Sequence, residues 1–323
     1  MIEIAERFIS ENYKKLGLLR VPSKISLVKM GGRQDRFSSV PFACFLNGKS
    51  YPTFYVKFPR DPTNPKRIKA EFYNLREIRR RAKSEIMKNS IPEPLWYNEA
   101  PVFSIQSAAA GTPILSGINW KNFSEMSGDV LAWLARFHKE TKMRQVNYQK
   151  YIRVEAEKLK REVGAYSKSI ADFLTRCFER GIEGSAEVPI TYIHGDFNPH
   201  NILINDGKLG VFDWEESSAG LPFIDVFHYF TVSGFSVEFS GRDKKLSKEA
   251  RYRVHFLENI GENLSFIADN YDFLDIDKKL FSSAYIFYLA HMAVNEIKRD
   301  RLVNDFEFWL KLLKIFLSKS ERS

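Results

Sequence analysis

Three side chains between positions 192 and 215 have the types and the spacing of a metal-assisted reaction site. This stretch reads YIHGDFNPHNILINDGKLGVFDWE, where Asp196 and Asp213 each follow an apolar run and Asn201 opens the run between them. NILI and LGVF read as two short strands, and the Asp206-Gly207 pair between them is typical of a hairpin turn. Closing this hairpin brings Asn201 close to Asp213, and Asp196 lies on the loop that feeds the same end. We therefore expect three oxygen-bearing side chains to converge there.

Oxygen ligands of this kind suit Mg²⁺, which proteins bind with one or two carboxylate or amide oxygens together with substrate phosphates. A third carboxylate that stays outside the metal's ligand set is able to act as a base. Phosphoryl transfer requires this combination, a metal ion on the phosphates and a base on the attacking hydroxyl. The alternative is that these residues only form turns at strand ends, since Asp, Asn and Gly all favour turns.

The same residues carry a family resemblance. His194-Gly195-Asp196, Asn201 and Asp213 fit the pattern H-G-D-x-x-x-x-N, an apolar hairpin and then D-W. This pattern resembles the catalytic and metal motifs of the aminoglycoside phosphotransferase and choline kinase family, which is related to the protein kinases. The resemblance extends from about residue 25 to about residue 230. It implies a protein kinase-like fold with ATP and Mg²⁺ as cofactors.

The resemblance also implies a role for each residue. Asp196 is implied to be the catalytic base, or the group that orients the acceptor hydroxyl. Asn201 and Asp213 are implied to hold Mg²⁺. Lys57, in the strand FYVKF, is implied to contact the α- and β-phosphates of ATP, although a strand-edge surface lysine would look the same. Glu71 on the next helix is its implied ion-pair partner, with Glu77 as the competing candidate.

The loop expected to cover the phosphates is MGGRQDRFSS, which lacks both the G-x-G-x-x-G pattern of protein kinases and a Walker A pattern. Gly31 and Gly32 are its only glycines. Similar small-molecule kinases use serine and backbone N–H groups at this place, so Ser38 and Ser39 are candidates, and an ordinary connecting loop is an equal alternative. The adenine is expected beside SIQSAAAG, at the backbone near Gln106 and Ala108.

The elements that must position these residues follow a clear order. KISLVKM, VPFACFL and PTFYVKF read as strands, the last two joined by a turn at Asn47-Gly48, and PLWYNEAPVFSIQS reads as a further hairpin. One helix is expected from about residue 65 to 86, with Asn64 as its cap. Helical periodicity dominates residues 119–181 and 224–318, and the only strands expected there flank the motif. The sequence thus predicts an α+β, two-lobed protein kinase-like fold: a small antiparallel-sheet N-lobe with one helix, residues 1–107, which binds the nucleotide, and a mostly helical C-lobe, residues 108–323, which carries catalysis and the acceptor.

Composition narrows the class of protein. The chain has 323 residues, of which 44% are hydrophobic and 28% charged, as in ordinary globular proteins. Its net charge of +9 favours an anionic partner. The basic stretch from Lys66 to Lys83 has apolar residues at helical spacing, so a solvated helix face is favoured and no nucleic-acid partner is expected. The two cysteines show no zinc spacing, the N-terminus is no signal peptide, and no apolar stretch is long enough to span a bilayer. The prediction is a cytoplasmic protein.

Three more residues near the motif are expected to be structural. His138 and His194 are interpreted as polar groups that brace the catalytic loop rather than as bases. Asp225 is interpreted as the cap of the helix that follows.

The acceptor is expected to be a small-molecule hydroxyl. No lysine lies two residues after Asp196, and only 12 positions separate Asp213 from Asp225, which leaves no room for the activation segment of a protein kinase. The net charge favours a neutral or anionic sugar-like alcohol. A cationic acceptor such as an aminoglycoside, choline or another amino alcohol is the close alternative. The alternative to a kinase is a pseudokinase, which binds the nucleotide without transferring phosphate. Acidic residues that could bind a cation are Glu215, Glu216, Glu258, Glu262, Asp269, Asp272, Asp275, Asp277 and Glu296.

Overall fold

The computed structural model describes residues 1–31, 38–109, 111–118, 122–164, 187–237, 245–273, 278–298 and 303–320, and the single positions 168, 172, 175 and 176. Its contacts divide the chain into two compact units. The first unit contains Met1–Pro113, His194–Asp196 and Asn201–Ser218, and the second contains Ile114–Ile193, Phe197–His200 and Ala219–Ser323. The predicted motif therefore lies mostly with the N-terminal unit, although it is distant from it in the sequence.

An antiparallel five-stranded sheet forms the centre of the first unit. Its order is β1-β2-β3-β5-β4, so that β1 and β4 are the edges. The bounds are β1 (Ile25–Lys29), β2 (Ser39–Leu46), β3 (Phe54–Pro59), β4 (Pro94–Glu99) and β5 (Val102–Ser107). These are the strands predicted above, and the β2–β3 and β4–β5 pairings are the two predicted hairpins, whereas the β1–β2 and β3–β5 pairings were not predicted. Asn47 and Gly48, in the seven-residue connection between β2 and β3, both have positive φ, a conformation that these two residue types tolerate.

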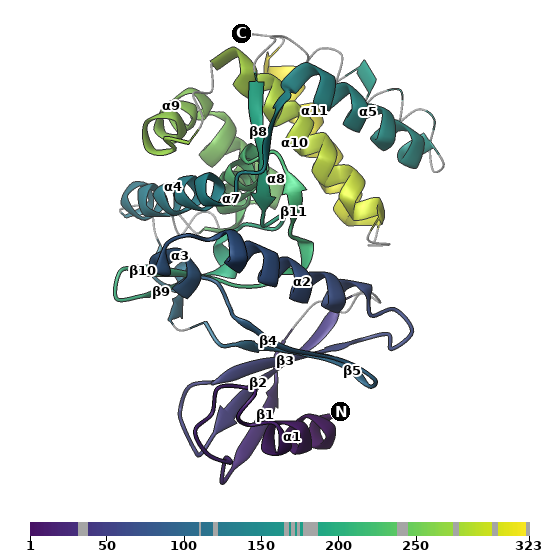
Figure 1. The fold of residues 1–323 in the computed structure, drawn as a ribbon. Helices are drawn as coiled ribbons and strands as arrows, with labels where there is room; N and C mark the ends of the chain where they lie inside the picture. The colour runs from purple at the N-terminus through teal and green to yellow at the C-terminus, as the bar shows by residue number, and fades with distance from the viewer. Residues whose placement is uncertain are drawn as a thin grey trace. The chain divides into compact units, whose positions relative to one another are not determined.

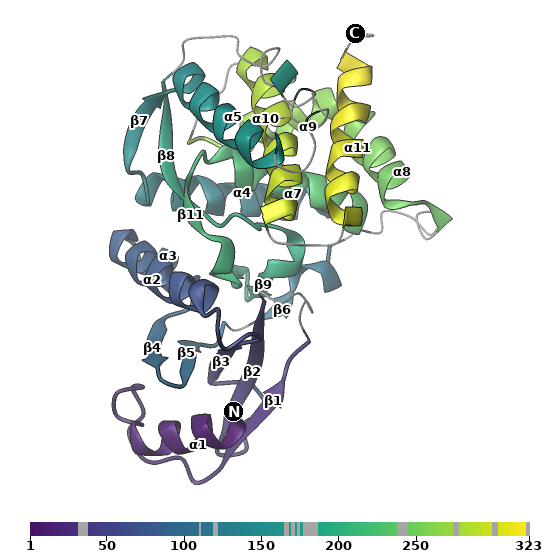
Figure 2. The ribbon, with the colours of Figure 1, turned by 90° about the vertical axis from the view of Figure 1, so that its right-hand side faces the viewer.

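Helix α1 (Ile2–Glu11) covers one face of this sheet (Figures 1 and 2). It buries Ala5 and Ile9 completely, in one core with Val56 and Phe103 of the sheet. The apolar residues of α1 recur at helical spacing and so form one face of the helix. The apolar residues of the strands alternate and so form one face of the sheet, and these two faces pack together.

The single helix predicted over residues 65–86 is wrong at its C-terminal end. The structure has α2 (Lys66–Arg81) and then a separate short helix, α3 (Glu85–Asn89). Ala82 adopts ψ 119°, which ends α2, and Ser84 starts α3 by accepting a hydrogen bond from the Met87 N–H. Asn64 makes no capping bond to α2.

The predicted motif hairpin is present in the first unit. Strands β9 (Ile202–Asn205) and β10 (Lys208–Val211) pair antiparallel, and Asp206 and Gly207 in their turn both have positive φ. A short strand that was not predicted, β6 (Thr112–Pro113), adds to the free side of β9. A 3₁₀ turn, η2 (Pro199–Asn201), precedes the hairpin and another, η3 (Trp214–Glu216), follows it.

The second unit is mostly helical, as predicted. A three-stranded sheet of order β11-β8-β7 accompanies its helices, and only β8 was predicted. No helix among the described residues is long and apolar enough to cross a bilayer. The remaining bounds are η1 (Ile114–Ser116), α4 (Phe123–Glu140), β7 (Arg144–Asn147), α5 (Tyr148–Gly164), β8 (Glu187–Ile193), β11 (Ser218–Gly220), α7 (Phe223–Ser236), α8 (Lys248–Tyr252), a π-helical turn η5 (Arg253–Leu257), α9 (Ile260–Asn270), α10 (Lys278–Lys298) and α11 (Val303–Ser320).

A buried polar network stabilises the core of the second unit. His138 contacts the Tyr271 hydroxyl through Nδ1 at 2.7 Å and the Asp225 carboxylate through Nε2 at 3.2 Å. All three side chains are buried. Asp225 lies in the first turn of α7, but no side chain caps that helix, so its interpretation as a cap is wrong. A buried carboxylate needs a buried donor, and His138 supplies it.

Candidate active site

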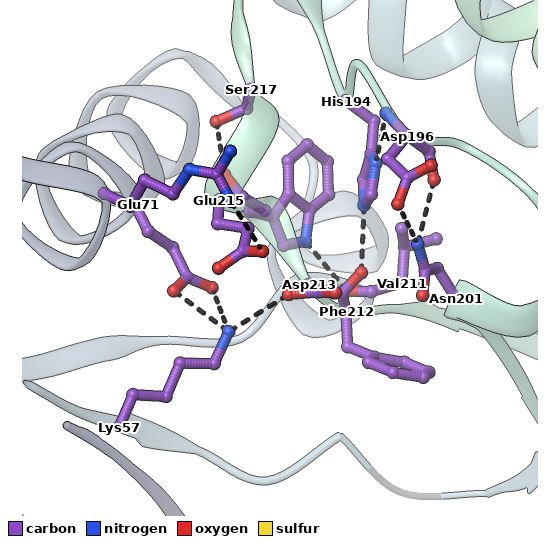
Figure 3. A network of polar contacts seen from close by, with 12 residues as sticks. Lys57, Glu71, His194, Asp196, Asn201, Val211, Phe212, Asp213, Glu215 and Ser217 are labelled. Atoms are coloured by element: carbon purple, nitrogen blue, oxygen red, sulfur yellow. Dashed lines mark hydrogen bonds and ion pairs between the residues drawn. The ribbon is translucent and has the colours of Figure 1, made fainter. Parts of the chain in front are cut away.

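Strand β3, helix α2 and the segment after β10 place three charged side chains together (Figure 3). The Lys57 ammonium donates to both carboxylate oxygens of Glu71, at 2.7 and 2.9 Å, and lies 3.3 Å from Asp213 Oδ1. Glu77, the competing partner, instead accepts from Arg80 and Arg81 on the outer side of α2. Lys57 and Glu71 are buried, whereas the Asp213 side chain is 38% exposed. The most accessible charge of the three is therefore the Asp213 carboxylate.

The electrostatics of this cluster keep Lys57 charged. Burial alone would lower the Lys57 pKa, but the negative charges of Glu71, Asp213 and Glu215 outweigh it and raise that pKa above its ordinary value. Burial raises the Glu71 pKa, and this is opposed by Lys57 and by a hydrogen bond from the Trp214 backbone. A charged, oriented ammonium is the group required for contact with a polyphosphate.

Glu215 and Glu216 lie beside this cluster, on η3. The Arg67 guanidinium lies 3.3 Å from Glu216 Oε1 and 3.9 Å from Glu215 Oε1. Burial raises the pKa of Glu215 to about 8, with a further contribution from the charge of Asp213. Both glutamates were considered above as partners of a cationic acceptor, and the structure instead pairs them with α2.

His194 holds the backbone on both sides of the site. Its Nδ1 accepts from the Asp196 N–H at 3.3 Å, and its Nε2 lies 2.9 Å from the Phe212 carbonyl oxygen. Because the carbonyl can only accept, the proton is on Nε2 and the ring is neutral in this arrangement. His194 therefore joins the loop that carries Asp196 to the residue before Asp213. This agrees with the bracing role expected for it.

Gly195 has to be glycine. Its φ is +78°, and a Cβ there would lie 2.5 Å from the carbonyl oxygen of Glu216. The loop before Asp196 therefore passes directly against η3, which only a residue without a side chain allows.

Asp196 and Asn201 are in direct contact. The Asn201 side-chain NH₂ donates to the Asp196 carbonyl oxygen at 2.9 Å and lies 3.4 Å from Asp196 Oδ2. The Asn201 backbone carbonyl accepts from the Phe212 N–H at 3.1 Å, which fixes Asn201 to the residue that precedes Asp213. The structure thus brings together Asp196, Asn201, Asp213, Lys57 and Glu71 within the first unit.

The residues present fit a magnesium ion that arrives with a nucleotide. The Asn201 NH₂ group is used internally, which orients its amide oxygen as the available ligand atom. Asp213 lies in the left-handed region, at φ 65°, and offers a partly exposed carboxylate. Among the described residues no group of three or more His, Cys, Asp or Glu side chains is suited to a metal ion. Two protein oxygens suit Mg²⁺ that is otherwise bound by phosphates and water, rather than a metal held by protein alone.

The other candidates for nucleotide binding lie at two places. Ser38 and Ser39 are buried at the start of β2, where Ser38 Oγ accepts from the Arg60 guanidinium at 3.1 Å. Gly31 is exposed at the end of β1, and Gly32 lies outside the described residues. No contact in the structure tests these four as phosphate ligands.

Gln106 and Ala108 lie at and just after the end of β5. Gln106 is buried and paired within the sheet. The Ala108 N–H donates to the Thr53 carbonyl at 3.1 Å, so in this structure its carbonyl is the group left for an adenine contact.

Several residues that hold the site could not be singled out from the sequence. The Asn74 side chain donates to the Ser217 carbonyl at 2.7 Å, and the Ser90 carbonyl accepts from the Val211 N–H at 2.8 Å. Together with Arg67 these residues join α2 and the α3–β4 connection to the segment around Asp213. The only signal in the sequence is that Arg67, Glu71 and Asn74 share one face of α2, at the spacing i, i+4, i+7.

Comparisons with known proteins agree with the predicted family. The model of the phosphotransferase enzyme family matches residues 42–253. The fold is shared with a putative aminoglycoside phosphotransferase from Ralstonia eutropha JMP134, with a TM-score of 0.64, 12% identity and coverage of 100% of this chain and 98% of the other. A choline kinase from Cryptosporidium parvum Iowa II gives a TM-score of 0.61 at 13% identity, with coverage of 100% and 96%.

A third solved structure, the GDP complex of aminoglycoside 2'-phosphotransferase-IIIa, gives a TM-score of 0.58 at 15% identity and covers 99% of both chains. No curated protein sequence matches the chain. The structural likenesses confirm the α+β, protein kinase-like fold.

Proposed function

The chain belongs to the phosphotransferase enzyme family, and on this premise we propose that it transfers the γ-phosphoryl group of ATP to a hydroxyl group of a small molecule. The observation that carries the proposal is the contact set of the first unit. Lys57 pairs with Glu71 and reaches Asp213, while Asn201 joins Asp196 to the residue before Asp213. These are the charges and oxygen ligands that phosphoryl transfer requires.

Each residue has a distinct part in the proposed reaction. Asn201 and Asp213 would hold Mg²⁺, which neutralises the charge that develops on the transferred phosphoryl group. Asp196 accepts the proton of the acceptor hydroxyl, or orients that hydroxyl for attack. Asn201 limits the movement of Asp196 by donating to its backbone and side chain. Lys57, oriented by Glu71, contacts the α- and β-phosphates, with Ser38 and Ser39 as further candidates at the phosphates.

The proposed acceptor is a neutral or anionic sugar-like alcohol. The net charge of +9 disfavours a polycation. The helical unit also contains a cavity of about 250 Å³, built largely from the helices after residue 224. Its lining residues include Phe123, Phe230, Phe256 and Phe266, with Asn259 and Glu262. Aromatic faces and amides of this kind suit a hydroxylated ring, and Glu262 is exposed, so it would attract a cation only weakly.

A cationic acceptor is the second candidate. Solved structures with this fold include complexes with kanamycin, gentamicin and streptomycin, and another is a choline kinase. Phenylalanine faces next to a carboxylate would also suit an ammonium group. The cavity lining therefore suits both a neutral and a cationic acceptor, and the experiment below distinguishes the two.

The test is ATP turnover by the purified protein with a panel of acceptors. Choline, ethanolamine and kanamycin are compared, in competition, with neutral sugars and sugar phosphates. We expect turnover with members of the neutral or anionic group. Phosphorylation of only the cations would overturn the acceptor proposal and leave the phosphotransferase proposal intact. Glu262→Gln should raise the KM only for a cationic acceptor. Its matched control is Asp269→Asn, which changes another exposed carboxylate of α9.

A chain that binds Mg·ATP but transfers no phosphate to any acceptor would be a pseudokinase. Binding and turnover are therefore measured on the same preparation, with calorimetry for Mg·ATP. Failure to bind Mg·ATP at all would overturn the assignment of the nucleotide site.

A further inference from the structure

The positive charge of the chain is concentrated in one short part of it. Between the end of α1 and the start of β3, residues 12–53 contain eight Lys or Arg residues and one acidic residue, Asp35. This segment therefore carries a net charge of +7, out of +9 for the whole chain. Basic residues that serve nucleotide binding should lie near the phosphates. Basic residues of this segment that lie elsewhere need another explanation, so we next ask where they lie.

Large apolar side chains are exposed in the same part of the molecule. Leu19 is 99% exposed, Tyr51 61% and Val21 53%. The neighbouring residue Leu18 packs onto the core of the sheet, so the fold uses one leucine of this pair and leaves the other in solvent. Of the large apolar residues that are exposed in the described part of the chain, seven of thirteen lie within the first 51 residues. Exposed apolar groups that gather on one surface commonly mark a contact with a partner.

Hydrogen bonds bring these basic and apolar residues together. The Asn47 side chain accepts from both the N–H and the hydroxyl of Ser23, at 2.8 and 3.0 Å, and the Asn47 N–H donates to the Lys24 carbonyl. The α1–β1 connection is thereby joined to the β2–β3 turn. We call this surface the basic tip. Its residues are Leu19, Arg20, Val21, Lys24, Lys49 and Tyr51, all of which are exposed.

The charges of the basic tip have no acidic partners in the part of the chain that the structure describes. Within the described residues, no ion pair joins Arg20, Lys24 or Lys49 to a carboxylate. The Lys49 ammonium lies 5.3 Å from the ring centroid of Tyr51. Three cations next to three exposed apolar side chains form a surface that is both positive and apolar.

This surface lies away from the proposed phosphate site. In the sheet, Ile25 pairs with Leu46 and Cys44 with Phe54, which places the basic tip beyond that end of the strands. Ser39 pairs with Pro59 at the other end. The eight residues from Ser39 to Leu46 span roughly 23 Å of strand, at about 3.3 Å for each step. The basic tip is therefore separate from the Ser38 and Lys57 end, and phosphate binding does not account for its charge.

We propose that the basic tip docks onto a membrane surface that carries anionic phospholipids. Lys24, Lys49 and Arg20 would lie against the headgroups, while Leu19 and Val21 enter the boundary with the acyl chains. A peripheral contact needs two signals to be stable, and this surface offers both charge and apolar side chains. Single-stranded nucleic acid is less suited, because its recognition rests on stacking with aromatic rings, whereas the most exposed residue here is an aliphatic leucine. The proposal does not depend on the proposed phosphotransferase activity.

The test is flotation of the full chain with vesicles of phosphatidylcholine, with or without phosphatidylserine. We expect binding only to the vesicles with phosphatidylserine, and weaker binding as salt rises from 0.1 to 0.5 M, since salt screens the lysines. Lys24→Gln with Lys49→Gln should weaken binding about 25-fold, at about fivefold for each removed charge. Leu19→Ser should weaken it about tenfold.

Controls come from another exposed surface, helix α5. Lys150→Gln with Lys160→Gln removes the same net charge, and Val154→Ser removes an apolar side chain that is 50% exposed. Neither control should reduce binding. Circular dichroism of all variants checks that they remain folded.

Three results would overturn the proposal. The first is the absence of binding to phosphatidylserine vesicles. The second is an equal loss in the α5 controls, which would mean that only net charge matters. The third is that a labelled single-stranded oligonucleotide binds through Lys24 and Lys49 while the vesicles do not, which would identify a nucleic-acid surface.

Discussion

Asp196 and Asp213 are both aspartates of one motif, but their surroundings differ. Asp196 is 9% exposed, and the Asn201 amide contacts its carboxylate. The Asp213 carboxylate is partly exposed and lies 3.3 Å from the Lys57 ammonium. A carboxylate beside the lysine that is proposed to contact the phosphates suits a metal ligand. A carboxylate held by an amide suits a base.

Asp196→Asn should leave nucleotide binding nearly intact and slow the chemical step by about 10²–10⁴-fold, the usual contribution of a general base. Calorimetry with Mg·ATP and single-turnover kinetics separate the two quantities. Asp206→Asn, in the exposed turn of the same hairpin, should change neither. Loss of ATP affinity in Asp196→Asn would mean that Asp196 is a metal ligand and that the proposed division of roles is wrong.

Asp213→Asn should instead weaken the binding of Mg·ATP and abolish turnover, because the amide keeps the shape and removes the negative charge that holds the metal. ATP in the presence of EDTA should bind equally to the native chain and the variant. The measurement is a titration of Mg²⁺ at fixed ATP, followed by turnover and calorimetry. Unchanged binding and turnover would contradict the assignment of Asp213.

At the scale of elements, the strands were predictable and several connections were not. β1 to β5 and the β9–β10 hairpin follow from apolar runs and from two turn dipeptides that need positive φ. β6, β7 and β11 have two to four residues, and their pairing with β8 or β9 comes from the tertiary fold rather than from local pattern. The break at Ala82 is likewise absent from the pattern, since Lys83 and Ser84 do not exclude a helix.

Helix α2 is the element that holds the site together. It is joined to the segment around Asp213 by Arg67, Glu71 and Asn74, which lie on one face over two turns. Glu71 was found from the family resemblance, but nothing in the pattern of a highly charged helix distinguishes Arg67 from its basic neighbours. The importance of Arg67 and Asn74 rests on their contacts with residues about 140 positions later in the chain.

Arg67→Met combined with Asn74→Leu should reduce kcat about 10- to 100-fold by letting the Asp213 segment shift, because small displacements of positioned groups have effects of that size. The Mg²⁺ concentration for half-maximal activity should rise in parallel, which a purely structural effect on stability would not cause. Arg67→Lys should restore part of the activity. Arg80→Met, which removes an ion pair with Glu77 on the exposed side of α2, is the control. Native Mg²⁺ dependence in the double variant would show that these contacts do not position Asp213.

At the scale of the whole molecule, the sequence does not predict which segments of the chain belong to each of the two units. The sequence indicates a change from strands to helices near residue 107, and a division at that point remains the prediction for the two functional lobes. The contacts group His194–Asp196 and Asn201–Ser218 with Met1–Pro113. Hydrogen bonds such as Asn74 to Ser217 and Val211 to Ser90 produce this grouping. A linear pattern of strands and helices contains no information about bonds between such distant residues.

This grouping makes a prediction about hydrogen exchange. Mg²⁺ with a nonhydrolysable ATP analogue should slow amide exchange in residues 54–81 and in residues 201–217 together, because both belong to one compact unit and are joined by Lys57, Glu71 and Asp213. Helices α10 and α11, which belong to the second unit, should change little. Mass spectrometry of peptides from the full chain measures all three regions in one experiment. Asp213→Asn should reduce the protection of both nucleotide-linked regions. Protection confined to residues 54–81 would mean that the nucleotide does not engage the hairpin, and it would contradict both the shared unit and the assignment of Asn201 and Asp213.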